Sequence, residues 1–129
     1  MFGGSGLALG GAGGSADAGA QLPVNKFLWR GTLDTLSFLP LSSTDPYGGV
    51  IVTDWGAAPD SPAERFKVTA YITSAALKPQ SLNVVVNRQR RGRNGAWVAA
   101  PVADKTKREL EDAILTRARQ LRAAAGDAG

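Results

Sequence analysis

The sequence predicts an α+β fold, a two-layer sandwich in which an N-terminal and a C-terminal helix pack on one face of a four-stranded antiparallel meander, in the order α-β-β-β-β-α. Three observations lead to this prediction. Residues 65–73 alternate between polar and apolar side chains, as in a half-buried strand. The β-branched run 50–53 follows a turn sequence. An apolar stripe with helical spacing lies near the C-terminus.

The chain has 129 residues, which suits one domain with a modest core. Glycine, alanine and serine dominate residues 1–20, so we expect a flexible leader or tether there. The folded domain is predicted over residues 21–122 and a frayed tail over 123–129. No segment reaches the ~18–20 apolar residues of a membrane span, and the leader lacks the basic start and unbroken apolar stretch of a signal peptide.

The first helix is predicted over residues 24–39, where apolar residues recur at spacings of three to five. Asn25 or a neighbour can serve as its N-cap. Pro40 lacks the amide that a helix interior needs, so the helix must end before it. Gly31 either weakens this helix or marks a close approach to the sheet.

A turn follows, because Asp45 supplies a side-chain acceptor, Pro46 presets φ, and Gly48 and Gly49 tolerate positive φ. We assign Tyr47 as a turn side chain. The run 50–53 is then the first strand. Asp54, at its end, could be a catalytic acid, but without a second carboxylate or a histidine it has no mechanism to join. The favoured role for Asp54 is to cap the turn or pair with an arginine.

The remaining strands form two hairpins in series. A loop over residues 56–63 precedes the strand at 65–73. Residues 82–87 and 96–100 are the next two strands, joined by a turn over 89–95 in which an Asn-Gly pair favours positive φ. Trp29 and Trp97 are interpreted as core or core-edge aromatics.

The last helix is predicted to begin at Thr106, which forms a capping box with Glu109, although Asp104 is a competing N-cap. Its apolar stripe includes Arg117, whose stem would lie along the stripe with its charged head in water.

The chain contains neither cysteine nor histidine. This excludes disulfides, thiol nucleophiles, imidazole acid–base catalysis and the usual zinc ligands. We therefore expect no enzyme activity, no metal and no cofactor. The glycine runs between residues 3 and 14 are not phosphate-binding loops, because no strand precedes them and no Lys-Ser or Lys-Thr pair follows.

The first candidate binding feature is an arginine cluster expected at a hairpin tip. Its members are Arg88, Arg90, Arg91 and Arg93. The net charge of +4 equals the charge of this cluster, so the excess is a patch. The cluster could grip phosphates, lipid headgroups or an acidic protein, or it could simply protect a sheet edge from pairing.

The second candidate is the sheet face away from the helices. Arg65, Lys67, Thr69 and Tyr71 share this face by alternation. Its neighbours would be Val85 and one of two alternative pairs, Ile51 with Trp55 or Val50 with Val52. The register of the first strand decides between these pairs. If no helix covers this face, it is a mixed apolar and basic platform suited to a protein partner; otherwise it is ordinary half-exposed sheet surface.

Several segments between Asn25 and Arg122 resemble a family of small uncharacterised envelope lipoproteins of Gram-negative, alphaproteobacterial-type bacteria, a domain of unknown function. The segments that carry this likeness are residues 28–30, 33–38, 45–55, 64–69 and 110–119. The resemblance implies a periplasmic or outer-membrane location. Family members start with a lipoprotein signal and a lipidated cysteine, which this chain lacks. If an anchoring cysteine precedes Met1, residues 1–20 would be the tether.

These observations lead to a functional expectation. We expect a non-enzymatic envelope protein that binds a protein partner near a membrane, using Arg65, Lys67, Tyr71 and the arginine cluster. An anionic membrane surface is a further possible contact. The alternative is a nucleic-acid-binding module on the same basic surface, which is less favoured because no recognition motif accompanies the patch.

Overall fold

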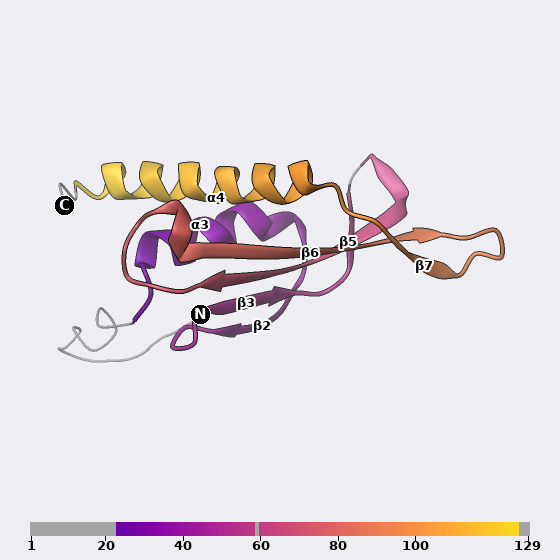
Figure 1. Cartoon of the computed structure of the whole chain (residues 1–129), viewed down its shortest axis with the longest axis horizontal. Helices are drawn as coiled ribbons and strands as arrows, with labels where there is room; N and C mark the ends of the chain where they lie inside the picture. The colour runs from indigo at the N-terminus through magenta and orange to yellow at the C-terminus, as the bar shows by residue number, and fades with distance from the viewer. Residues whose placement is uncertain (1–22, 59, 127–129) are drawn as a thin grey trace.

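A computed structural model describes residues 23–58 and 60–126 of the chain. Two helices, α3 and α4, lie on the same side of one antiparallel sheet, so the molecule has two layers (Figure 1). This confirms the α+β class, the antiparallel sheet and a helix at each end of the fold. The predicted strand number is wrong, because the sheet has six strands within the described residues and not four. The predicted leader, residues 1–20, lies outside the described residues.

The helices and strands follow one another along the chain as α3 (Lys26–Thr35), the 3-10 helix η2 (Leu36–Phe38), β2 (Leu41–Asp45), β3 (Val50–Thr53), β4 (Gly56–Ala58), β5 (Ser61–Ile72), the 3-10 helix η3 (Pro79–Ser81), β6 (Leu82–Arg91), β7 (Trp97–Ala100) and α4 (Asp104–Ala124). The strand order across the sheet is β2-β3-β5-β6-β7, and β4 pairs with the beginning of β5. All of these pairings are antiparallel.

The two strands that the sequence did not predict are β2 and β4. All five residues of β2 are exposed, so no alternation of apolar side chains marks it. It forms because the turn at Asp45 returns the chain on itself, with the Gly49 amide donating to the Asp45 carbonyl at 2.8 Å. Strand β4 consists of glycine and alanine and pairs with the beginning of β5. Backbone pairing creates both strands, and side-chain periodicity does not report it.

Helix α3 is shorter than predicted, because the last turn before Pro40 is the 3-10 helix η2. Asn25 caps its start, and its Oδ1 accepts from the amides of Phe27 and Leu28, both at 2.9 Å. Gly31 does mark a close approach, but to α4 and not to the sheet. A Cβ at this position would lie 3.0 Å from the Ala118 nitrogen and the Ile114 oxygen.

Helix α4 begins at Asp104, two residues before the predicted start. Ala103 is its N-cap and makes no side-chain capping bond, so the predicted Thr106 capping box is wrong. The carboxylate of Glu109 is instead 3.9 Å from Lys105, one helical turn earlier. Strand β7 ends at Ala100, so only three residues separate β7 from α4, and the helix starts as soon as the chain has crossed to the other layer.

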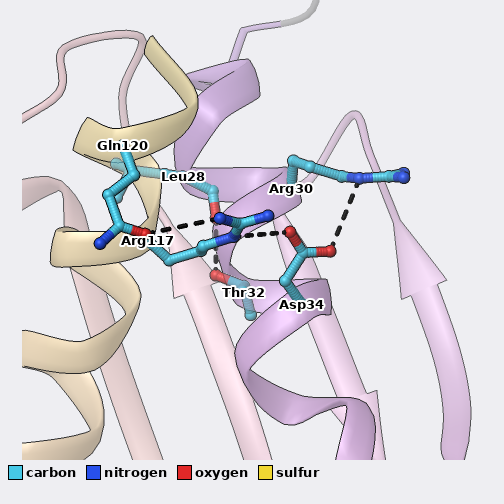
Figure 2. Close-up of polar contacts among 6 residues, drawn as sticks. All are labelled: Leu28, Arg30, Thr32, Asp34, Arg117 and Gln120. Atoms are coloured by element: carbon cyan, nitrogen blue, oxygen red, sulfur yellow. Dashed lines mark hydrogen bonds and ion pairs between the residues drawn. The ribbon is translucent and has the colours of Figure 1, made fainter. Parts of the chain in front are cut away.

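Polar contacts join α3 to α4 at their exposed rim (Figure 2). Arg117 Nε donates to Asp34 Oδ2 at 3.0 Å, and Arg30 lies 3.7 Å from the other oxygen of the same carboxylate. The sequence predicted that the charged head of Arg117 lies in water. In the structure this head is paired with the Asp34 carboxylate. Beneath it, Thr32 Oγ1 donates to the Leu28 carbonyl at 2.7 Å, which satisfies a buried hydroxyl.

The core lies between the helices and the inner face of the sheet. Its buried apolar residues are Val24, Leu28, Leu36, Leu39, Ile51, Val68, Ala70, Ile72, Leu82, Val84, Ile114, Leu115 and Ala118. The apolar set of β5 thus faces inward, and its polar set faces outward.

A β-bulge between β3 and β4 sets the direction of Trp55. Val52 lies opposite Thr69 and Gly56 lies opposite Phe66. The three residues between Val52 and Gly56 therefore span the same interval as the two residues between Phe66 and Thr69. The extra residue reverses the alternation, so that Val52 and Trp55 point to the same side of the sheet.

Candidate binding face

The face of the sheet away from α3 and α4, here called the outer face, is not covered by any described helix (Figure 1). Tyr71 is 39% exposed on it and Val85 is 42% exposed. Val50 lies opposite Tyr71, and Val52 and Val85 both lie opposite Thr69. These residues form the apolar end of the outer face. Ile51 and Thr53 are buried on the other side, so the pair Val50 and Val52 is the one that faces outward.

The other end of the outer face holds a row of alternating aromatic and cationic side chains, here called the Trp–Arg stack. Its members are Trp55, Arg65, Trp97 and Arg91. The Arg65 guanidinium lies 4.9 Å from the Trp55 ring centre and 4.4 Å from that of Trp97, and the Arg91 guanidinium lies 4.6 Å from the Trp97 ring. Each such contact contributes about 0.5–1 kcal/mol at an exposed site.

Strand register brings these residues together from four segments of the chain. Arg91 lies directly opposite Trp97 across β6 and β7, and Arg65 lies opposite Gln89 across β5 and β6. Arg65 Nε donates to Gln89 Oε1 at 2.7 Å. The bulge supplies Trp55 from the other flank of β5. The guanidinium of Arg65 thus lies over two indole rings, and its Nε is held by a hydrogen bond to Gln89.

The predicted arginine cluster does not gather on one surface. Arg88 lies on the inner side, where its Nε donates to Glu64 at 2.6 Å and its Nη1 to the Pro101 carbonyl at 3.1 Å. Arg90 shares that side, whereas Arg91 joins the Trp–Arg stack on the outer face. Arg93 is exposed in the turn after β6. Strand β6 extends to Arg91, farther than predicted, so strand alternation sends neighbouring arginines to opposite faces.

The charges of the molecule are divided between its two sides. The ion pairs among residues 23–58 and 60–126 join α3 to α4, join neighbouring turns of one helix, or connect Arg88 to Glu64 on the inner side. None of them involves Arg65, Lys67 or Arg91. Lys67 lies on β5 between Arg65 and the apolar end, opposite Asn87. The basic end of the outer face, defined by Arg65, Lys67 and Arg91, therefore carries positive charge that no described carboxylate neutralises.

The turn residues have local partners. Asp45 Oδ1 accepts from the amides of Tyr47 and Gly48 at 3.1 and 3.0 Å. Gly49 has a φ of 74°, and a Cβ there would lie 2.1 Å from the Ile72 carbonyl oxygen, so only glycine fits. Pro46 lies inside this turn. The Asp54 carboxylate accepts from the Trp55 amide at 2.7 Å.

Three further findings concern a metal site, a membrane span and an apolar groove. Within the described part of the chain, no cluster of acidic side chains could hold a metal ion, and no helix is both long and apolar enough to cross a bilayer. An apolar groove of about 300 Å³ lies under the first half of α4, on the side of the sheet opposite the Trp–Arg stack. Its lining includes Phe38, Phe66, Val86 and Leu110, and Glu109 is its one carboxylate.

The sequence interpretation missed the roles of Trp97 and Gln89 and left that of Trp55 open. Trp97 was expected in or near the core, but it lies on the outer face among cations. The spacing between Arg91 and Trp97 was the available signal. A hairpin centred on the Asn-Gly turn places these two residues opposite each other once the strand is allowed to reach Arg91.

Comparison with known proteins places the chain in a family. A family model described as "Domain of unknown function (DUF3576)" matches residues 22–123. An uncharacterised protein of Rickettsia prowazekii (strain Madrid E), an alphaproteobacterium, is 35% identical over 98 residues. The match covers 76% of this chain and 58% of that protein, so the chain spans somewhat over half the length of this relative. These matches confirm the resemblance as far as a domain of unknown function that occurs in alphaproteobacteria. The chain belongs to the family described as Domain of unknown function (DUF3576).

Proposed function

We propose that this protein is a non-enzymatic binding module that docks a protein partner on the outer face of its sheet, near a membrane of the cell envelope. One observation carries the proposal: the outer face is open, and one of its ends holds a preordered set of indoles and guanidiniums without a neutralising carboxylate. A protein partner that covers this face would supply both the missing apolar contact and the missing negative charge.

The residue types on the outer face suit a protein interface. Tryptophan, tyrosine and arginine are enriched at the positions that dominate protein–protein binding energies. The Trp–Arg stack holds these long side chains in place before binding, so less conformational entropy is lost when a partner docks. The apolar end, with Val50, Val52, Tyr71 and Val85, adds a surface that gains from exclusion of water.

A nucleic-acid partner is less well supported by the same geometry. Proteins that bind single strands stack bases on open aromatic faces. Here guanidiniums already lie over the rings of Trp55 and Trp97. The three valines and the tyrosine of the apolar end also match a protein surface better than a phosphate backbone.

The envelope location in this proposal rests on the sequence resemblance to envelope lipoproteins. Arg90 and Arg93, which lie outside the Trp–Arg stack and are exposed near the β6–β7 turn, are available for an anionic membrane surface. Such a surface attracts basic residues by about 1 kcal/mol each.

Site-specific photo-crosslinking tests the docking face. A photoreactive amino acid replaces Tyr71 in the full chain, expressed in its native cells, and the cross-linked products are identified by mass spectrometry. We expect one protein partner to be captured from the membrane fraction, and we expect its yield to fall at least about tenfold when Trp97→Ala is added, as for an interface hot spot.

The matched control carries the same photoreactive group at Arg119, which is exposed on α4. The proposal predicts that this control does not capture the partner. Equal capture from both positions, or no partner from Tyr71, contradicts docking on the outer face.

A further inference from the structure

We propose that the basic end of the outer face is a carboxylate receptor, which recognises an extended acidic segment of the partner with carboxylates on alternate residues. This inference rests on the proposed function and specifies the chemistry of the partner. It is carried by the donor geometry of Arg65 and Arg91, by the position of Lys67, and by the spacing of residues along β5.

Arg65 keeps hydrogen-bond donors that a ligand can use. Its guanidinium lies over the rings of Trp55 and Trp97, and its Nε donates to Gln89. Its terminal amino groups have no protein acceptor within the described residues. The remaining edge of the fork matches a carboxylate, which arginine binds with two parallel hydrogen bonds. The stack therefore holds a carboxylate-binding edge in a fixed orientation.

Arg91 and Lys67 extend the receptor to either side of Arg65. Arg91 is stacked on Trp97, and its Nη1 donates to the Gly95 carbonyl at 3.1 Å, which leaves other donors of its fork available. Lys67 lies two residues from Arg65 on the same strand and face. All three groups are cationic at neutral pH, so their mutual repulsion is relieved when an anionic ligand binds.

The spacing along β5 defines the pattern of the ligand. Residues two apart in a strand point to the same face and lie about 6.4–6.8 Å apart. Moving along β5, the outer face presents Arg65, then Lys67, then Thr69 between Val52 and Val85. An extended segment lying along β5 has the same repeat. Acidic residues at two successive alternate positions would meet Arg65 and Lys67, and an aliphatic residue at the next would meet the valines.

The experiment uses the full chain and a synthetic peptide of about nine residues. Its odd-numbered positions are valine, glutamate, glutamate, glutamate and valine in that order, and each even-numbered position is serine. The peptide reads the same in both directions, so chain direction does not matter. Isothermal titration calorimetry should show binding that weakens at least about fivefold between ~50 and ~200 mM salt, because charged contacts are screened. A peptide with glutamine in place of each glutamate should bind at least about tenfold more weakly.

Variants separate the receptor geometry from charge alone. Arg65→Gln should lower the affinity for the glutamate peptide roughly ten- to hundredfold, as expected for loss of hydrogen bonds to a charged group. Arg65→Lys keeps the charge but loses the planar fork, and it should show most of the same loss. Arg119→Gln removes one exposed positive charge on α4 and should leave the affinity unchanged. Thermal melts of all variants show whether the fold is intact.

Three results would overturn the inference. These are equal binding of the glutamate and glutamine peptides, full affinity in Arg65→Lys, or tighter binding of a single-stranded oligonucleotide than of the peptide. If the peptide fails while crosslinking at Tyr71 still captures a partner, the docking face stands and only its acidic chemistry is wrong. If the peptide binds as expected but no partner is captured, the receptor stands and the protein-docking proposal fails.

Discussion

At the scale of single residues, Thr53 shows how the bulge is stabilised from inside. Its side chain is fully buried, and its Oγ1 accepts a hydrogen bond from the Val68 amide at 2.9 Å. At this point β3 leaves its regular pairing with β5, so the side-chain oxygen replaces a backbone carbonyl. Thr53, which in the sequence is one more β-branched residue of a strand, thus supplies the acceptor for the buried Val68 amide.

We predict that Thr53→Val lowers the free energy of unfolding by about 1–3 kcal/mol, because it leaves the buried Val68 amide without an acceptor. Thr53→Ser should retain the hydrogen bond and lose less. Urea denaturation followed by circular dichroism measures both. Thr69→Val, on the half-exposed outer face, is the control and should change stability by less than about 0.5 kcal/mol. An equal effect at the two positions would contradict the role given to Thr53.

At the scale of elements, the contact between α3 and α4 depends on close packing more than on charge. Gly31 lies against the backbone of α4 at Ala118, with no room for a larger side chain. The ion pair between Asp34 and Arg117 lies at the rim, where the two side chains are 31% and 45% exposed (Figure 2). Solvent screens such a pair, so it contributes little. The glycine is what allows both helices to share one face of the sheet.

Substitutions at these two sites should therefore differ in size. Gly31→Val forces the helices apart and should cost about 1–3 kcal/mol, despite the better helix propensity of valine. Asp34→Ala should cost less than about 1 kcal/mol. Chemical denaturation of the two variants in the same buffer makes the comparison, and a larger loss in Asp34→Ala would show that the ion pair dominates the contact.

At the scale of the whole molecule, the distribution of charge that favours ligand binding lowers the stability of the fold. The described ion pairs lie on the helix side or the inner side of the sheet, while Arg65, Lys67 and Arg91 on the outer face take part in none of them. Like charges on neighbouring strand positions repel one another. A surface that would be more stable if one cation were replaced is typical of a binding site, where function and stability compete.

Lys67→Glu tests this opposition. We predict that it raises the free energy of unfolding by a few tenths to about 1 kcal/mol, because repulsion from Arg65 becomes attraction. The same change should lower the affinity for the acidic peptide at least about tenfold, since it places a carboxylate in the receptor. Arg119→Glu, with an equal change of charge on α4, should leave peptide affinity unaltered. Loss of stability in Lys67→Glu would show that the basic end carries no unfavourable charge.

Local patterns made the element types predictable. The alternation from Arg65 to Thr73 identified β5 and its outward set, because a strand repeats every two residues whatever its neighbours are. Pro40 and the Asp45 turn marked where the first helix had to end and where β3 had to begin, since the limits on φ and on amide donors belong to individual residues. The apolar stripe of α4 was readable for the same reason.

Pairing between distant segments decided the rest. The polar strand β2 exists only because β3 lies beside it, and a one-residue bulge determined where Trp55 points. The Trp–Arg stack combines β5, β6, β7 and the segment before β4, so no local window contains it. The amino-acid sequence alone determined both helices, the strands β3, β5, β6 and β7, and which side chains of β5 face outward. Only the tertiary structure decided the register between strands, and through it which cations and aromatics meet, because register is a property of two segments at once.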